Sequence, residues 1–121
     1  MLMRNIIRSQ KRGGLRKLLY TLVLAVGADA QAAFVTLIAT RLIVKEFGVN
    51  VTMGASNVSH GLSDRRILNG IFMALAIACG LSCPITNPLV RQVREAILAS
   101  NLFLGHDEWA MNWITYFRSQ S

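Results

Sequence analysis

The chain has 121 residues, of which 53% are hydrophobic and 16% charged, and it carries a formal net charge of +7. This length suits one modest domain and excludes a two-domain enzyme, while the apolar content excludes a disordered chain. Two cysteines are too few for a disulfide-rich scaffold. Six of the 13 basic residues lie in the first 17 positions, which contain no acid, so the remaining chain is nearly neutral. We therefore expect neither a nucleic acid nor a membrane as partner.

Residues 1–17 form a basic leader that we expect to lie outside the fold. The apolar run that follows, residues 18–26, is typical of a strand that is buried on both faces of a parallel sheet. Together with the leader and the small residues at 28–30, the same run also resembles a secretory signal. In that alternative, residues 1–30 are removed from an exported, non-enzymatic small protein. A membrane-spanning helix is not favoured, because the run is well short of the roughly 20 apolar residues that it needs.

Helical periodicity alternates with short β-rich segments along the rest of the chain. Strands are expected over residues 18–26, 49–53 and 83–86, and helices over residues 30–47, 64–79 and from 88 onward. The apolar residues expected to face the core from the first helix are Ala33, Phe34, Leu37, Ile38 and Leu42. Those expected to do so from the second helix are Ile67, Leu68, Ile71, Phe72, Leu75 and Cys79. Both stripes follow the 3.6-residue repeat of an amphipathic helix.

The third helix has a clear predicted start, because Asn87 is a good cap and Pro88 suits the first helical position. Its apolar residues expected to point inward are Leu89, Val93, Ala96 and Ile97. A last amphipathic segment covers residues 107–117, and its aromatic residues are interpreted as a packing stripe; they are Trp109, Trp113 and Tyr116. We interpret His106-Asp107 as a helix cap and not as a catalytic pair.

The alternation of strands and helices predicts an α/β fold with a parallel sheet. The strands are short, as in a β/α barrel, but three strands are too few to close one. In such folds, functional residues follow the carboxyl ends of the strands, which singles out the loop at residues 54–61. This loop combines glycines with hydroxyl and amide side chains, which suits a flat heterocycle with several ring nitrogens. An ordinary polar turn remains the alternative.

The segment GASNVSHGLSDR, residues 54–65, together with Leu68-Asn69, resembles a pterin-binding signature. The signature is that of methyltetrahydrofolate-dependent methyltransferases, on a barrel like that of dihydropteroate synthase. These enzymes include the corrinoid/iron–sulfur-protein methyltransferase and the folate module of cobalamin-dependent methionine synthase. The resemblance continues through residues 72–77, 79–81, 85–88 and 101–107, and it spans roughly residues 18–118. It implies that residues 18–121 are the C-terminal three β/α units of a (β/α)8 TIM barrel.

The resemblance also implies roles for single residues. Asn57 matches the catalytic asparagine, whose side chain hydrogen-bonds the pterin nitrogen that bears the methyl group. Gly54 and Ser56 match positions that line the pterin, and Arg65 matches an arginine at its edge. Ile85 matches an apolar wall of the pocket, and we place His60 at the rim. The implied methyl donor is methyltetrahydrofolate, and the implied acceptor is a corrinoid (cobalamin) carried by a partner protein.

Tyr20 departs from the family pattern, because it stands where relatives have an aspartate that binds the pterin. A complete barrel takes about 250 residues, so we expect this chain to be a truncated, cytoplasmic protein that is inactive alone. We also expect it to self-associate through exposed sheet edges. A dihydropteroate synthase relative is a further alternative. Such a relative is expected to have a basic phosphate-binding loop near the last strand, and residues 86–88 do not provide one. No bound metal is expected, because the two cysteines are read as small buried residues.

Overall fold

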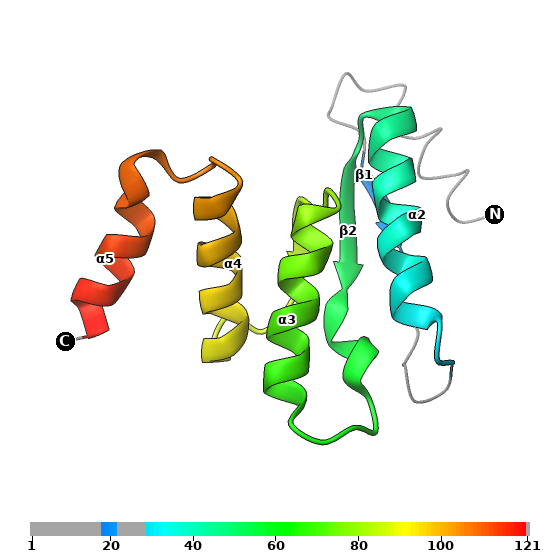
Figure 1. Ribbon diagram of the computed structural model, residues 1–121, viewed down its shortest axis with the longest axis horizontal. Helices are drawn as coiled ribbons and strands as arrows, with labels where there is room; N and C mark the ends of the chain where they lie inside the picture. Colours follow the sequence, from blue (N-terminus) through cyan, green and yellow to red (C-terminus); the bar gives the residue numbers. More distant parts are fainter. Residues whose placement is uncertain (1–17, 22–28, 121) are drawn as a thin grey trace.

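The computed structural model describes residues 18–21 and 29–120, apart from the side chains of residues 18–21 and of Asn57 (Figure 1). The elements in chain order are β1 (Leu18–Thr21), α2 (Ala32–Phe47), β2 (Asn50–Gly54), η1 (Ala55–Ser59), α3 (Arg65–Ala78), β3 (Cys83–Ile85), α4 (Arg91–Phe103), η2 (Glu108–Ala110) and α5 (Met111–Gln120). The basic leader predicted at residues 1–17 lies outside the described residues, as does the part of the first predicted strand beyond Thr21. The proposed signal peptide therefore falls almost wholly outside them as well.

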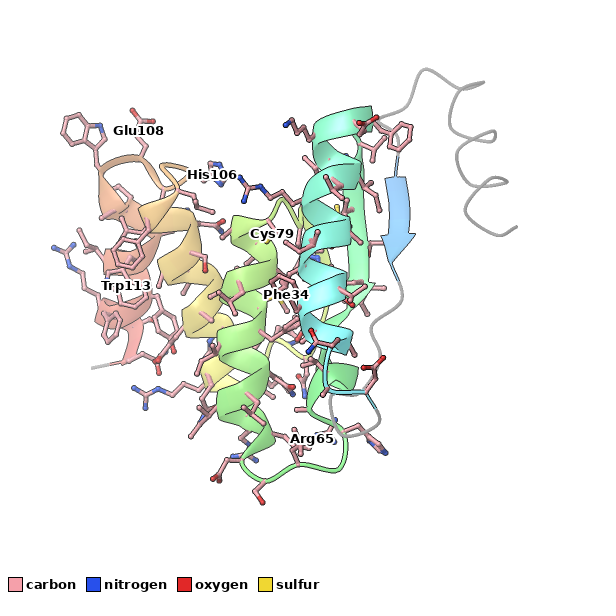
Figure 2. The ribbon with its side chains drawn as sticks, turned by 45° about the vertical axis from the view of Figure 1, so that its right-hand side comes forward. Phe34, Arg65, Cys79, His106, Glu108 and Trp113 are labelled. Atoms are coloured by element: carbon pink, nitrogen blue, oxygen red, sulfur yellow. The ribbon has the colours of Figure 1, made fainter. Side chains whose placement is uncertain are left out.

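The three strands form one parallel sheet in the order β1-β2-β3, so strands that follow one another in the chain are neighbours. Figure 2 shows helices α2, α3 and α4 on the same side of this sheet. Val51 and Met53 are fully buried in the core that these helices cover, while Thr52 points to the opposite face because side chains alternate along a strand. The strand register places Cys83, which is exposed, beside Thr52. Within the described residues, no helix covers this second face.

The core lies between the sheet and the helices. Its buried residues are Val49, Val51, Met53, Ala55, Val58, Phe72, Met73, Ala76, Ile77, Leu81 and Val93. Helices α3 and α4 approach each other closely at Gly70, because a Cβ atom at that position would lie 2.8 Å from the backbone oxygen of Gln92. A glycine is therefore required at this crossing, since a methyl group would push the two helices apart.

The predicted inner face of the first helix is partly wrong. Ala33 and Leu37 are half-buried against the core, but Phe34, Ile38 and Leu42 are exposed. The residues of α2 that are buried instead are Ala32, Thr36 and Thr40. Both threonine hydroxyls donate to the backbone oxygen four residues earlier, at 2.9 and 2.8 Å, so they can be buried without an unpaired polar group. Small residues at these positions let α2 lie close to the sheet.

The buried face of α3 is rotated relative to the apolar stripe that the sequence predicts. Phe72 is buried as expected and Cys79 is half-buried, whereas Ile67, Leu68, Ile71 and Leu75 are all exposed. The buried residues of the helix are Gly70, Phe72, Met73, Ala76 and Ile77. The close crossing with α4 accounts for the burial of Gly70, while Phe72, Met73, Ala76 and Ile77 belong to the core beside the sheet.

Helix α4 begins at Arg91, so the start predicted at Asn87 and Pro88 is wrong. The Asn87 side chain accepts a hydrogen bond from the backbone N–H of Leu89 at 3.0 Å, and its backbone oxygen accepts one from Val90 at 3.2 Å. These bonds form a turn that comes before the helix. Leu89 is consequently 83% exposed and does not point inward, whereas Val93 is buried as predicted. Ala96 and Ile97 are half-buried.

The cap predicted at residues 106–107 is confirmed in the case of Asp107. Its two carboxylate oxygens accept hydrogen bonds from the backbone N–H groups of Asn112 at 2.9 Å and Trp113 at 3.0 Å, at the start of α5. The aromatic stripe is wrong in one member, because Trp109 is 84% exposed and adopts a positive φ of 57°. Trp113 and Tyr116 are half-buried. No helix among the described residues is long and apolar enough to cross a membrane.

Candidate functional site

The carboxyl edge of the sheet brings together residues that are 31 positions apart in the chain. Gly54 is the last residue of β2, and the strand register pairs it with Ile85, the last residue of β3. The single-turn helix η1 continues directly from Gly54 and contains Ser56, which is exposed, and Asn57. Four of the predicted site residues therefore share one edge of the sheet. The side chain of Asn57 lies outside the described part of the structure.

A hydrogen-bonded clamp holds η1 against the start of α3. The Arg65 guanidinium donates to the backbone oxygen of Ser56 at 3.0 Å and to the Ser59 hydroxyl oxygen at 3.1 Å. The Ser59 hydroxyl donates in turn to the side-chain oxygen of Asn69 at 2.5 Å. Ser59 is only 1% exposed, so its hydroxyl is shielded from water, whereas the bond from Arg65 to the Ser56 oxygen is exposed. Asn57 thus lies between residues whose backbone positions are fixed by side-chain contacts.

The clamp contains Ser59, which the sequence offered only as one of the polar groups of the loop, and Asn69, which was not among the predicted site residues. Both belong to the segment that carries the pterin-binding resemblance, but neither was assigned a structural task. The signal that identifies them is the burial of a hydroxyl side chain in a polar loop, because such a hydroxyl needs partners in the fold. Sequence spacing alone does not show which residues those partners are.

The structure also shows the contacts and exposure of the other predicted site residues. Arg65 lies at the start of α3, and both of its described side-chain bonds are directed to η1, so it supports the loop. His60 follows η1 and is exposed. Ile85 is 58% exposed and presents an aliphatic side chain beside Gly54. Tyr20 lies in β1 opposite Thr52, and the effect of the tyrosine on the pocket stays a prediction because its side chain is not described.

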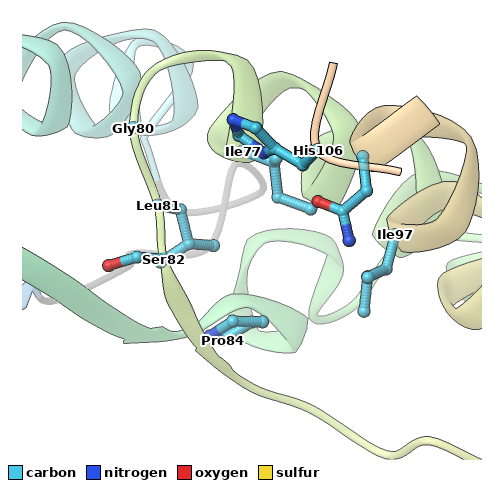
Figure 3. A pocket seen from close by; sticks show the side chains of 8 residues that line it. Ile77, Gly80, Leu81, Ser82, Pro84, Ile97 and His106 are labelled. Carbon is cyan, nitrogen blue, oxygen red and sulfur yellow. The ribbon is translucent and has the colours of Figure 1, made fainter. Parts of the chain in front are cut away.

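A cavity of about 280 Å³ lies at the opposite, amino end of β3. Figure 3 shows its lining side chains, among them Leu81, Ser82, Pro84, Ile97 and His106. Ser82 is already engaged, because its hydroxyl oxygen accepts a hydrogen bond from the backbone N–H of Val51 at 3.0 Å. Across the described ranges, no three His, Cys, Asp or Glu side chains lie close enough together to hold a metal ion.

A second cavity, of about 410 Å³, lies at the carboxyl end, between the first turns of α3 and α4. Its lining residues are Arg66, Asn87, Leu89, Val90, Arg91 and Gln92. Arg91 donates to the Glu95 carboxylate at 2.7 Å. This hydrogen bond and the accompanying charge attraction lower the pKa of Glu95 and raise the pKa of Arg91. The carboxyl end of the sheet therefore has basic side chains near its polar loop.

The chain is similar to the methylcorrinoid:tetrahydrofolate methyltransferase of Eubacterium limosum, with 33% identity over 70 residues. The match covers 58% of this chain and 26% of the relative, so the chain matches about a quarter of the length of that enzyme. No family model matches the chain. This similarity supports a relationship to that methyltransferase family.

Proposed function

We propose that this chain supplies the pterin-binding side of a methyltransferase that exchanges a methyl group between a folate and a corrinoid. In this proposal, residues 18–121 are the last three β/α units of a (β/α)8 barrel. The observation that carries it is the pairing of Gly54 with Ile85 at the edge where η1 begins. The similarity to the methyltransferase of Eubacterium limosum supports it. The sheet face without a helix also fits, because in a barrel that face lines the interior.

The described residues at the carboxyl edge suit one face and one polar edge of a pterin ring. Gly54 has no side chain, so a flat ring can approach the backbone closely. Ile85 offers an exposed apolar surface beside it, against which a ring can pack. Ser56 is exposed and adds a hydroxyl that both donates and accepts hydrogen bonds. These three residues are adjacent at one edge, as a planar polar heterocycle requires.

Asn57 is the residue that we assign to the chemistry. When a methyl group leaves or reaches the pterin nitrogen, the charge on that nitrogen changes during the reaction. An amide donor that binds this nitrogen more strongly in the transition state lowers the barrier. The clamp formed by Arg65, Ser59 and Asn69 holds η1 in place, so less reorganisation is needed as the charge develops. Arg65 therefore acts as a positioning residue in this proposal.

The corrinoid cobalt, carried by a partner protein, supplies the other methyl-carrying centre. The name of the similar enzyme gives methylcorrinoid as donor and tetrahydrofolate as acceptor. The resemblance noted in the sequence implies the opposite direction, with methyltetrahydrofolate as donor. One pterin site serves both directions, because the forward and reverse reactions pass through the same transition state. We assign none of the described residues to the corrinoid.

A chimeric enzyme tests this function. The 70 matched residues of this chain replace their counterparts in the Eubacterium limosum methyltransferase, and methyl transfer between methylcorrinoid and tetrahydrofolate is measured. We expect the chimera to be active and Asn57→Ala to lower its kcat by about 100-fold, the typical effect of removing one transition-state donor. Ser63→Ala, an exposed residue of the same loop without an assigned role, is the matched control and retains activity.

Equal activity of the Asn57→Ala and parent chimeras contradicts the role of Asn57. A folded but inactive parent chimera contradicts the proposed function as a whole. If the chimera does not fold, the chain itself is titrated with millimolar methyltetrahydrofolate while its backbone amide shifts are recorded. Shifts confined to residues 54–57 and 85 support the site, and the absence of any shift contradicts it. We expect no micromolar binding by calorimetry, because one side of a pocket excludes little water from a ligand.

A further inference from the structure

The cavity between the first turns of α3 and α4 lies at the same end of the sheet as the proposed pterin site. Asn87, which lines the cavity, follows Ile85 by two residues, and Ile85 pairs with Gly54. The cavity is about 410 Å³ in volume and is not part of the ring-binding edge described above. A ligand bound at η1 with a long substituent can therefore reach it.

Arg66 is the main charged group of this cavity. Its neighbour Arg65 is committed to η1 through two hydrogen bonds, whereas Arg66 has no hydrogen-bond or ion-pair partner among the residues that the structure describes. Consecutive residues on a helix point about 100° apart, which explains why one arginine supports the loop and the other lines the cavity. Arg66 thus carries a positive charge that the described fold leaves uncompensated.

A second guanidinium is held in a defined position. Arg91 donates through Nε to the Glu95 carboxylate one turn further along α4, at 2.7 Å. Glu95 does not line the cavity, so no carboxylate is among the lining residues. Arg91 is thus engaged on the side of α4 that carries Glu95, and it contributes positive charge to the cavity wall.

The start of α4 adds further hydrogen-bond donors to the cavity. Helix α4 has no side-chain cap and no acidic residue in its first turn. Its first backbone bond runs from Arg94 N–H to the oxygen of Val90, so the N–H groups of Arg91, Gln92 and Val93 have no backbone partner among the residues that the structure describes. The side-chain oxygen of Asn87 is occupied by the Leu89 N–H, which leaves its NH2 group as a donor. Unpaired N–H groups at a helix start, next to arginines, favour an anion.

We propose that this cavity binds the glutamate carboxylates of a folate whose pterin ring occupies the η1 edge. This inference rests on the proposed function, since a folate is a pterin joined through aminobenzoate to one or more glutamates. The planar guanidinium of Arg66 pairs with a carboxylate in a fork of two hydrogen bonds. Uncapped α4 N–H groups bind a second carboxylate oxygen. The basic cavity then gives affinity for the tail, while the η1 edge gives selectivity for the ring.

The first experiment probes the anion site without the pterin. The full chain is titrated with γ-linked triglutamate, with monoglutamate and with inorganic phosphate, and the backbone amide shifts of Gln92 and Val93 are followed. We expect triglutamate to shift both amides saturably, and Arg66→Gln to weaken that response about threefold or more, as the loss of an exposed ion pair predicts. Arg41→Gln, on the exposed side of α2, is the matched control and leaves the response unchanged.

Absence of a shift at Gln92 and Val93, or an unchanged response in Arg66→Gln, overturns the anion site. An equal response to phosphate and triglutamate overturns the assignment to a glutamate tail, because it identifies a site for free anions. These readouts do not require pterin binding, so their failure is distinguishable from failure of the proposed function.

The second experiment joins the two sites. Tetrahydropteroate, which lacks glutamate, is compared with tetrahydrofolates that carry one and three glutamates, using the amide shifts of residues 54–57. We expect affinity to rise with the number of glutamates in the parent chain and to become independent of it in Arg66→Gln. If tetrahydropteroate binds at η1 but the tail adds no affinity, this inference is wrong and the proposed function stands. If none of the three ligands shifts residues 54–57, the folate assignment of the cavity is wrong together with the proposed function.

Discussion

The two ends of the sheet differ in how their polar groups are used. At the amino end, the Ser82 hydroxyl is bonded to the backbone of β2, and Gly80 packs directly against Val44 of α2. At the carboxyl end, Ser56 and Arg66 are exposed and point to space that the described fold leaves open. Parallel β/α units commonly separate these tasks, with stability at the amino ends of the strands and ligand chemistry at the carboxyl ends.

The comparison teaches that a cavity is not by itself evidence of a site. The cavity of Figure 3 lies at the amino end. Its lining includes Ser82, whose hydroxyl bonds the backbone of Val51, and Gly80, which packs against Val44. The cavity beside α4 lies at the carboxyl end, and its lining includes Arg66, which has no hydrogen-bond or ion-pair partner among the described residues. Substitutions at the amino end should therefore change the free energy of unfolding, and substitutions of the exposed side chains at the carboxyl end should change ligand binding.

The largest expected effect is at Gly80. This residue has a φ of +111°, and a Cβ atom built on it would lie 2.8 Å from Cγ2 of Val44. We expect Gly80→Ala to lower the free energy of unfolding by about 3 kcal/mol, from backbone strain together with steric overlap. Gly61, at the carboxyl end, is the matched control because its φ is +84° but nothing lies within 4 Å.

Gly61→Ala should cost only about 1 kcal/mol, because strain acts there without overlap. Urea unfolding of both variants, followed by circular dichroism, measures the difference. A cost at Gly61 that equals or exceeds the cost at Gly80 would remove the structural distinction between the two ends.

The second prediction concerns the clamp. Ser59→Ala removes the buried hydroxyl that binds both Arg65 and Asn69, and the loss of two hydrogen bonds of about 1 kcal/mol each lowers stability by about 2 kcal/mol. It should also release η1 and so abolish the amide shifts that methyltetrahydrofolate causes at residues 54–57. Ser63→Ala removes an exposed hydroxyl from the same loop and should change neither stability nor shifts. Retention of the shifts in Ser59→Ala would show that the clamp does not position the site.

The third prediction separates α5 from the site. Asp107→Ala removes the carboxylate that caps α5 and should lower stability by about 1 kcal/mol. Hydrogen exchange should accelerate at the amides of Asn112 and Trp113, while ligand-induced shifts at the carboxyl edge stay unchanged. Glu108→Ala, at an exposed neighbour, is the control. A change in ligand binding on loss of the cap would connect the two regions and contradict their separation.

The smallest expected effect is a pH dependence at the α4 cavity. Arg91 lowers the pKa of Glu95, so the ionised carboxylate is more favourable in the folded chain than in the unfolded chain. The stabilisation is therefore present above the ordinary glutamate pKa of about 4.3 and is lost as the pH falls through the lower folded value. A carbon-detected titration should show the pKa of Glu95 rising toward its ordinary range in Arg91→Gln. An unchanged titration would show that the pair is not formed in solution.

The strands and helices were largely predictable from the sequence, because apolar runs and glycine stops mark them locally. Helix α2 was expected over residues 30–47 and is found at Ala32–Phe47, and β3 was expected at residues 83–86 and is found at Cys83–Ile85. The buried faces were less predictable. Thr36 and Thr40 can be buried because their hydroxyls bond to backbone oxygens within the helix. Their burial was not predicted, because a search for apolar residues at helical spacing leaves threonine out.

The start of α4 and the clamp depended on contacts that no local pattern shows. Asn87 and Pro88 have the composition of a helix start, but the Asn87 side chain bonds Leu89 in a preceding turn. In the site, the position of Asn57 after β2 was predictable from the loop and the family resemblance. The bonds of Ser59 to Asn69 and Arg65 were not, because they depend on how α3 returns beside η1.

The central claim is that the carboxyl edge of the sheet binds the pterin. The most direct test records the backbone amide shifts of the full chain during titration with millimolar methyltetrahydrofolate. The account predicts saturable shifts at Gly54, Ser56, Asn57 and Ile85, and a loss of those at η1 in Ser59→Ala. Shifts that instead cluster at Ser82 and His106, or no shifts at all, would contradict it.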